Sequence, residues 1–172
     1  MWSARIAALA MLVALVGCGP STGQVRTARS ARYRASPEAL LDATVAALRA
    51  HRYVIAGLDP IAGTVQTEPI WFSAAGTKRS NHRTRALDRD IRFAIGARVE
   101  PRAEGTFGIT LEAVAARTHN GLHELVPIEP QDADAPSWFG TRLDDVYLDI
   151  YQRLRGSVVA PPAARSPAPS RR

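Results

Sequence analysis

The chain has 172 residues, of which 46% are hydrophobic, enough for a folded domain with one core. Its formal net charge is +6, but residues 36–156 hold fourteen Lys and Arg and all sixteen acidic residues, so this segment has a net charge of −2. A nucleic-acid-binding domain carries its basic stripe on the folded part. The excess positive charge lies outside that segment, which argues against a nucleic-acid partner.

The first residues have the pattern of an export signal. Residues 2–5 form a short basic start, and residues 6–17 are all apolar or small. This run is shorter than the roughly 20 apolar residues that a membrane-spanning helix needs, and its layout is typical of a secretory signal. We therefore expect residues 1–17 to be a signal peptide.

The end of this signal contains the only cysteine of the chain. The residues Leu15, Val16, Gly17 and Cys18 resemble the lipobox of bacterial lipoproteins. The resemblance implies cleavage before Cys18 and lipidation of this residue, with Gly19 rather than Asp after it favouring the outer membrane. Two alternatives stay open: an ordinary cleaved signal peptide, and a buried N-terminal helix with a free thiol.

The segments on either side of the central region are predicted to lack a core. Residues 18–35 show no apolar periodicity and are expected to be a flexible basic tether that reaches at most about 56 Å. Its four arginines would either approach anionic headgroups or be solvated. Residues 157–172 are rich in Pro, Ala and Ser and are expected to be disordered. The predicted periplasmic domain is residues 36–156.

The predicted domain begins with a helix and two short strands. Ser36 is a suitable N-cap, and Pro37 fits the first helical position. The apolar spacing from Leu40 to Leu48 continues a helix, after which strands are expected near residues 53–55 and 63–67. A turn is expected at Asp59, and a long polar loop at residues 73–88.

The middle of the chain alternates between apolar and polar residues. Residues 91–99 and 107–113 predict two antiparallel strands with one buried face. Asn120 and Gly121 predict a two-residue hairpin into a fifth strand at 122–128. A last amphipathic helix is expected from about Leu143 to Leu154. The predicted fold class is α+β, an antiparallel sheet of about five strands with N- and C-terminal helices on one face, in the order α-β-β-β-β-β-α.

A second resemblance concerns the start of this domain. The helix, the Tyr53-Val54-Ile55 strand and the segment 59–67 resemble envelope lipoproteins related to BamC, an accessory of the barrel-assembly machinery. The resemblance covers residues 36–68 at most. It implies a small α+β unit with a helix packed on an antiparallel sheet, and it assigns no binding residue.

No catalytic motif is evident. His119 and His123 have the spacing of a metal pair on a helix, but the intervening Asn-Gly favours a hairpin that points them to opposite sides. Asp88 and Asp90 are more typical of a charged strand entry than of a general acid–base pair. We therefore expect no catalytic residue, no metal site and no cofactor.

Two features are candidates for binding a partner. The loop at residues 73–88 carries the basic residues Lys78, Arg79, Arg83 and Arg85 together with His82, and a loop of this length is either functional or disordered. Two Trp-Phe pairs also lie at element ends. If exposed together they would form an aromatic hot spot, and otherwise they are core residues beneath loops; they are Trp71, Phe72, Trp138 and Phe139.

These features predict a non-enzymatic outer-membrane lipoprotein, held by lipid at Cys18, whose periplasmic domain binds another envelope component. The first alternative is a ligand-binding or hydrolytic envelope protein that acts on cell-wall glycan from the sheet face opposite the helices. The second is a structural lipoprotein whose basic ends engage anionic surfaces.

Overall fold

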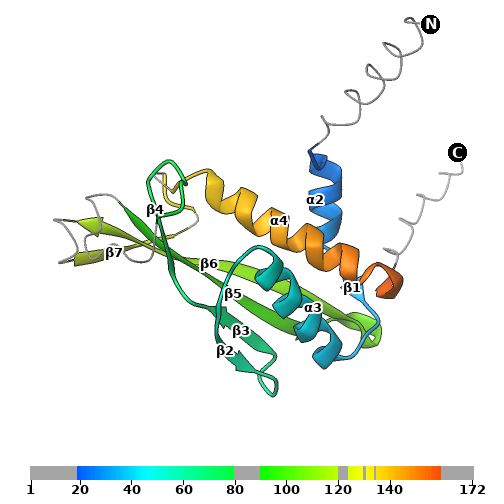
Figure 1. The fold of residues 1–172 in the computed structure, drawn as a ribbon. Helices are drawn as coiled ribbons and strands as arrows, with labels where there is room; N and C mark the ends of the chain where they lie inside the picture. The colour runs from blue at the N-terminus through cyan, green and yellow to red at the C-terminus, as the bar shows by residue number, and fades with distance from the viewer. Residues whose placement is uncertain (1–18, 80–89, 120–123, 130, 134, 160–172) are drawn as a thin grey trace, which may run out of the picture.

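The computed structural model describes residues 19–79, 90–119, 124–129, 131–133 and 135–159. Its helices are α2 (Thr22–Arg29), α3 (Pro37–Ala50) and α4 (Trp138–Arg153), with short 3-10 turns at Ala103–Gly105 and Arg155–Ser157. The strands, in chain order, are β1 (Arg32–Tyr33), β2 (Ile55–Asp59), β3 (Thr64–Thr67), β4 (Ile70–Phe72), β5 (Ile91–Pro101), β6 (Phe107–His119), β7 (Glu124–Ile128) and β8 (Val158–Val159). Figure 1 shows α3 and α4 lying across a long twisted sheet.

The sheet is built around the long hairpin of β5 and β6. These strands pair antiparallel from Ile91↔Arg117 to Pro101↔Phe107. One edge of the hairpin pairs with β3 and β4, at opposite ends of β5, and β2 extends the sheet beyond β3. The other edge pairs with β7 at one end of β6 and with β1 at the other, and β8 adds to β1.

The alternation of β5 and β6 decides which face of the sheet is buried. Ile91, Phe93, Ile95, Ala97 and Val99 are all buried, and their neighbours Arg92 and Arg98 are exposed. On β6 the buried members include Ile109 and Leu111, which pair with Val99 and Ala97. The alternation predicted for these two strands is confirmed, and it leaves one face of the sheet for the helices.

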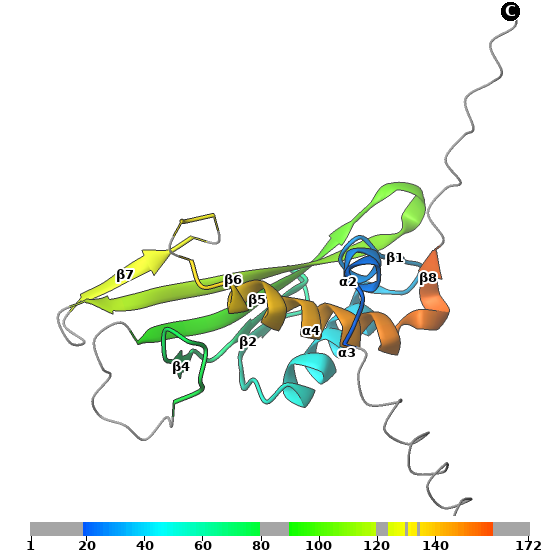
Figure 2. The same cartoon turned by 90° about the horizontal axis from the view of Figure 1, so that it is seen from above.

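The helices α3 and α4 cover that face (Figure 2). The hydroxyl oxygen of Ser36 accepts from the Ala39 N–H at 3.2 Å, as expected for the predicted N-cap. Leu40 and Leu48 of α3 and Val146 and Ile150 of α4 are at most 1% exposed and join the sheet residues in one core. The α+β class with an antiparallel sheet is therefore confirmed.

The number of elements and the placement of the helices differ from the prediction. The sheet has eight strands rather than about five, because β1, β4 and β8 are only two or three residues long and too short to show an alternation. The described chain has three α-helices rather than two, and the first of them, α2, packs against α4.

The prediction of a structureless tether is wrong for most of residues 19–35. Ser21 caps α2 by a reciprocal pair of bonds with Gln24, and β1 follows at once, with Tyr33 only 2% exposed. Polar helices stabilised by caps and by one packed residue leave no apolar periodicity, so the pattern missed this segment. At the other end β8 pairs with β1, so the fold extends to Val159. Residues 160–172 lie outside the described residues.

The hairpin predicted at Asn120 and Gly121 also has a different register. His119 pairs with Glu124 rather than with residue 122, so four residues connect β6 to β7. The connecting residues 120–123, including His123, lie outside the described part of the chain, so the predicted orientation of the two histidines stays a prediction.

Candidate functional site

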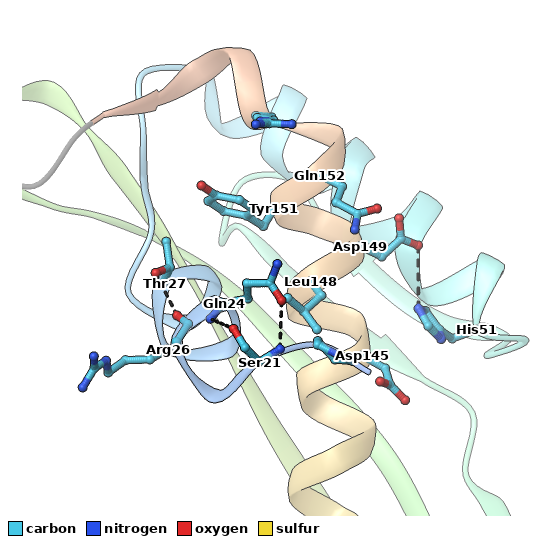
Figure 3. Close-up of a pocket in the computed structure, with 13 residues that line it drawn as sticks. Ser21, Gln24, Arg26, Thr27, His51, Asp145, Leu148, Asp149, Tyr151 and Gln152 are labelled. Carbon is cyan, nitrogen blue, oxygen red and sulfur yellow. Dashed lines mark hydrogen bonds and ion pairs between the residues drawn. The ribbon is translucent and has the colours of Figure 1, made fainter. Parts of the chain in front are cut away.

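A hollow among the described residues is a groove between α2 and α4 (Figure 3). It has a volume of about 1080 Å³ and is broadly open to solvent. Most of the residues that line it have polar side chains, and these include the hydroxyl, amide and carboxylate groups of Ser21, Gln24, Asp145, Tyr151 and Gln152. The lining also includes the apolar side chains of Pro20 and Leu148. We call this hollow the α2–α4 groove.

One wall of the groove is the docked helix α2. The Arg29 Nε donates to Asp144 Oδ1 of α4 at 2.5 Å, and its guanidinium lies 5.9 Å from the ring centre of Tyr147. Ala28 is the one fully buried residue of this helix. Tyr147 is itself fixed, because its hydroxyl oxygen accepts from the Leu111 N–H of β6 at 2.7 Å, and burial raises the pKa of this phenol.

One charged group of the groove lining, Asp149, is paired with an arginine. Asp149 accepts two bonds from Arg153 on its own helix, at 2.8 and 3.2 Å. The Nε2 of His51, at the end of α3, lies 3.7 Å from Asp149 Oδ2, too far for a hydrogen bond. Figure 3 shows His51 and Asp149 facing each other across the two helices. This arrangement fits the binding of a polar ligand, and within the described residues no nucleophile is joined to His51 by a hydrogen bond.

The described residues contain no group of three His, Cys, Asp or Glu arranged to hold a metal ion. Among these same residues, no helix is long and apolar enough to cross a bilayer.

The structure brings together three members of the two Trp-Phe pairs predicted from sequence. Phe72 and Trp138 have ring centres 5.0 Å apart, Trp138 and Phe139 4.6 Å apart, and all three surround Phe93. Phe72 is 1% exposed and Phe139 is 4% exposed. These two residues are therefore core residues, and the prediction that they contact a partner is wrong, because α4 closes over the end of β4.

The turn after β4 explains why this cluster is closed. The Trp138 Nε1 donates to the Ala74 carbonyl at 3.1 Å, and Arg142 Nη2 donates to the Gly76 carbonyl at 2.9 Å. The Arg142 guanidinium also lies 4.2 Å from the ring centre of Phe72. Two bonds from α4 thus hold the turn at residues 73–77 against the helix.

Trp71 has the opposite orientation to Phe72. It pairs with Arg92, whose side chain points away from the helices, and it is partly exposed. The next residues on the same face are Ala116, opposite Arg92, and Ala94 paired with Val114. Val114 is 59% exposed. We call these five residues the outer-face patch: Trp71, Arg92, Ala94, Val114 and Ala116.

The predicted basic loop is only partly described. Lys78 is exposed, and its backbone forms an isolated antiparallel β-bridge with that of Phe72. The Arg79 Nη2 lies 3.2 Å from Oδ1 of the buried Asp90. Arg79 therefore binds its own sheet. Arg83 and Arg85 lie outside the described residues, as does Cys18, and their predicted roles stay predictions.

The groove residues were not found from the sequence. Those of α2 lie in the segment predicted to be a tether, and those of α4 are on the polar side of an amphipathic helix, which is ordinarily a solvated face. The signal that could have found α2 is Ser21 followed three residues later by Gln24, the pattern of a capping box.

Comparisons with known proteins do not assign the chain. No protein-family model matches it, and no curated protein matches its sequence.

Proposed function

We propose that this chain is an outer-membrane lipoprotein, anchored by lipid on Cys18, whose α+β domain binds another envelope protein without catalysing a reaction. The observation that carries the proposal is the lipobox-like run from Leu15 to Cys18, the only cysteine, at the end of a short apolar signal. Two lipid signals on one residue suffice for stable anchoring.

The fold adds a geometric consequence to this proposal. Only Gly19, Pro20 and Ser21 separate Cys18 from the first residue of α2. Three residues span at most about 11 Å. An anchored domain would thus sit directly at the headgroup layer, with the start of α2 and the α2–α4 groove nearest to the bilayer.

The outer-face patch is the surface that we propose for the partner. Val114 is 59% exposed, and on the edge strand β7 Leu125, which pairs with Thr118 on the same face as Val114, is 40% exposed. Aromatic and arginine side chains beside small apolar residues are typical of interface centres, and Trp71 and Arg92 supply them here. Because the patch lies away from the helices, a partner could reach it while α3 and α4 stay packed.

Chemical crosslinking in intact membranes tests this surface. The full chain and the variant Val114→Lys are each crosslinked, purified and compared for captured envelope proteins. Asp42→Lys is the matched control, since it places the same lysine on an exposed position of α3. We expect Val114→Lys to lose a captured protein that the wild type and Asp42→Lys both retain. Identical captures from all three proteins, or no capture by any, would contradict the proposed surface.

A second candidate function is the binding of a polar ligand such as cell-wall glycan in the α2–α4 groove. The observation that favours it is the lining of hydroxyl, amide and carboxylate groups around the Tyr151 ring in a space of about 1080 Å³. Isothermal titration with soluble glycan fragments tests it. Binding that Tyr151→Ala abolishes would support this function, and the absence of heat at millimolar glycan would refute it.

A further inference from the structure

We propose that α2 is a detachable strap, which holds the anchored domain at the membrane when docked on α4 and extends its reach when it unfolds. The inference rests on the proposed lipid anchor at Cys18. It concerns the conformation of α2, which the partner proposal does not involve, and unfolding of α2 would remove one wall of the α2–α4 groove.

The contact with α4 buries few residues of α2. Seven of the eight residues of α2 are exposed or only partly buried, and Ala28 alone is fully buried. The principal polar contact is the Arg29–Asp144 ion pair, whose side chains are 47% and 24% exposed. Exposed ion pairs contribute little to stability and are weakened by salt. The free energy that holds α2 in place is therefore much smaller than that which holds the core.

Release from α4 also unfolds the helix. Isolated helices shorter than about 12–15 residues are marginal in water, and α2 has only eight residues. The caps at Ser21 and Ser30 satisfy its terminal backbone groups but do not replace the lost packing. Undocking thus converts residues 22–29 into coil.

The unfolding has a defined end. Arg32 and Tyr33 form β1, which pairs with both β6 and β8, and Tyr33 is 2% exposed within the core. Opening that began at Ser21 would stop at β1, because removing Tyr33 would expose a large buried ring. The strap is therefore the segment from residue 19 to residue 31.

The two states differ greatly in reach. With α2 docked, three residues lie between Cys18 and the domain, a span of at most about 11 Å. With α2 unfolded, the connection from Cys18 to Arg32 spans at most about 48 Å. As a relaxed coil it would average about 20 Å. The strap would let one domain work at the headgroup layer or well away from it.

Hydrogen exchange on the full chain purified from membranes tests the strap directly. We expect the amides of residues 25–30 to exchange at least about 100-fold faster than those of β5, because they open without global unfolding. Arg29→Ala should increase the amide exchange rate of α2 by a further factor of about three to five, because the ion pair is lost, and should leave the exchange rate of β5 unchanged. The control Arg153→Ala removes a similar ion pair that lies within α4 itself, to Asp149, and should leave α2 unchanged. Protection of α2 equal to that of β5, or equal acceleration of both elements by Arg29→Ala, would overturn the inference.

Energy transfer on vesicles tests the change of reach. The donor is attached through Ile61→Cys, in the exposed turn between β2 and β3 on the side of the domain away from α2 (Figure 1), and the acceptor is on lipid headgroups. Arg29→Ala should lower the transfer efficiency relative to Arg153→Ala. Failure of the protein to stay on vesicles would refute the anchor, and the strap with it. Retention with unchanged transfer, despite faster exchange in α2, would refute the strap alone.

Discussion

Gly76 offers a direct test of how the turn after β4 meets α4. Its φ is +81°, and a Cβ added there would lie 2.8 Å from Cδ1 and 2.9 Å from Cγ of Trp138. Gly105 has a similar φ of +67°, yet a Cβ there has no atom within 4 Å. Alanine at either position therefore meets backbone strain, but only Gly76→Ala also forces the Trp138 ring to move.

The two effects can be separated by comparing the variants. A left-handed backbone costs an L-residue about 1–2 kcal/mol. Overpacking a closed core adds about 1–3 kcal/mol. The entropic effect of replacing Gly by Ala in the unfolded chain is shared by both variants and cancels. We expect Gly76→Ala to lower the free energy of unfolding by about 1–3 kcal/mol more than Gly105→Ala does.

Urea denaturation followed by circular dichroism measures this difference. With a slope of about 2 kcal/mol/M, the midpoint of Gly76→Ala should lie about 0.5–1.5 M below that of Gly105→Ala, with the slopes unchanged. Because Trp138 contacts Phe72 and Phe139, its near-ultraviolet signal should change in Gly76→Ala alone. Equal midpoints for the two variants would refute the packing of Trp138 over this turn.

Further predictions concern the core, the first cap and the buried phenols. Phe93→Ala should lower the free energy of unfolding by about 3–5 kcal/mol, because the ring is 0% exposed and has three aromatic neighbours. Substitution of the exposed neighbour, Arg92→Ala, should change the free energy of unfolding by less than about 0.5 kcal/mol. A loss below about 1 kcal/mol for Phe93→Ala would contradict the packing of the aromatic cluster. Ser36→Ala should cost about 1 kcal/mol in the same assay and Ser36→Gly less, and equal losses would argue against the capping bond. Burial raises the pKa of Tyr33 and Tyr53 above the ordinary 10.0, so these phenols ionise at a lower pH in the unfolded chain than in the folded one. The stability that they contribute is therefore complete below about pH 10 and falls as the pH rises towards their folded pKa values. Denaturation midpoints that stay constant under alkaline conditions, with phenolate absorbance rising at its ordinary pH, would refute this.

The parts of the fold that were predictable are those with a long periodic pattern. In β5 and β6 the alternation is long, and it predicted both strands and their buried face. In α3 the cap at Ser36 and the spacing from Leu40 to Leu48 defined the helix. Long elements show a periodic pattern over many residues, whereas β1 and β8 have two residues each and show none. They are strands because β1 pairs with β6 and β8 pairs with β1.

The site was less predictable for a different physical reason. A groove forms where two elements distant in sequence lie side by side, and neither Ser21 nor Tyr151 contains information about the other. The different burial of Trp71 and Phe72 illustrates the same limit. They are neighbours on β4, and which of them is buried depends only on the face of the sheet that α4 covers. From the sequence, the Trp-Phe pairs could form either an exposed hot spot or part of the core. The packing of α4 on the sheet buries Phe72 and Phe139 in the core.

The mass of the mature N-terminal peptide tests the central claim most directly. The protein is isolated from the outer-membrane fraction of the cells that produce it and digested with trypsin, and the mass of the N-terminal peptide that ends at Arg26 is measured. We expect a peptide that begins at Cys18 and carries the added mass of a diacylglyceryl group and one acyl chain. We also expect the Cys18→Ala protein to be lost from this membrane fraction. A mature chain that begins elsewhere, or an unmodified Cys18 in a protein found free of membranes, would contradict it.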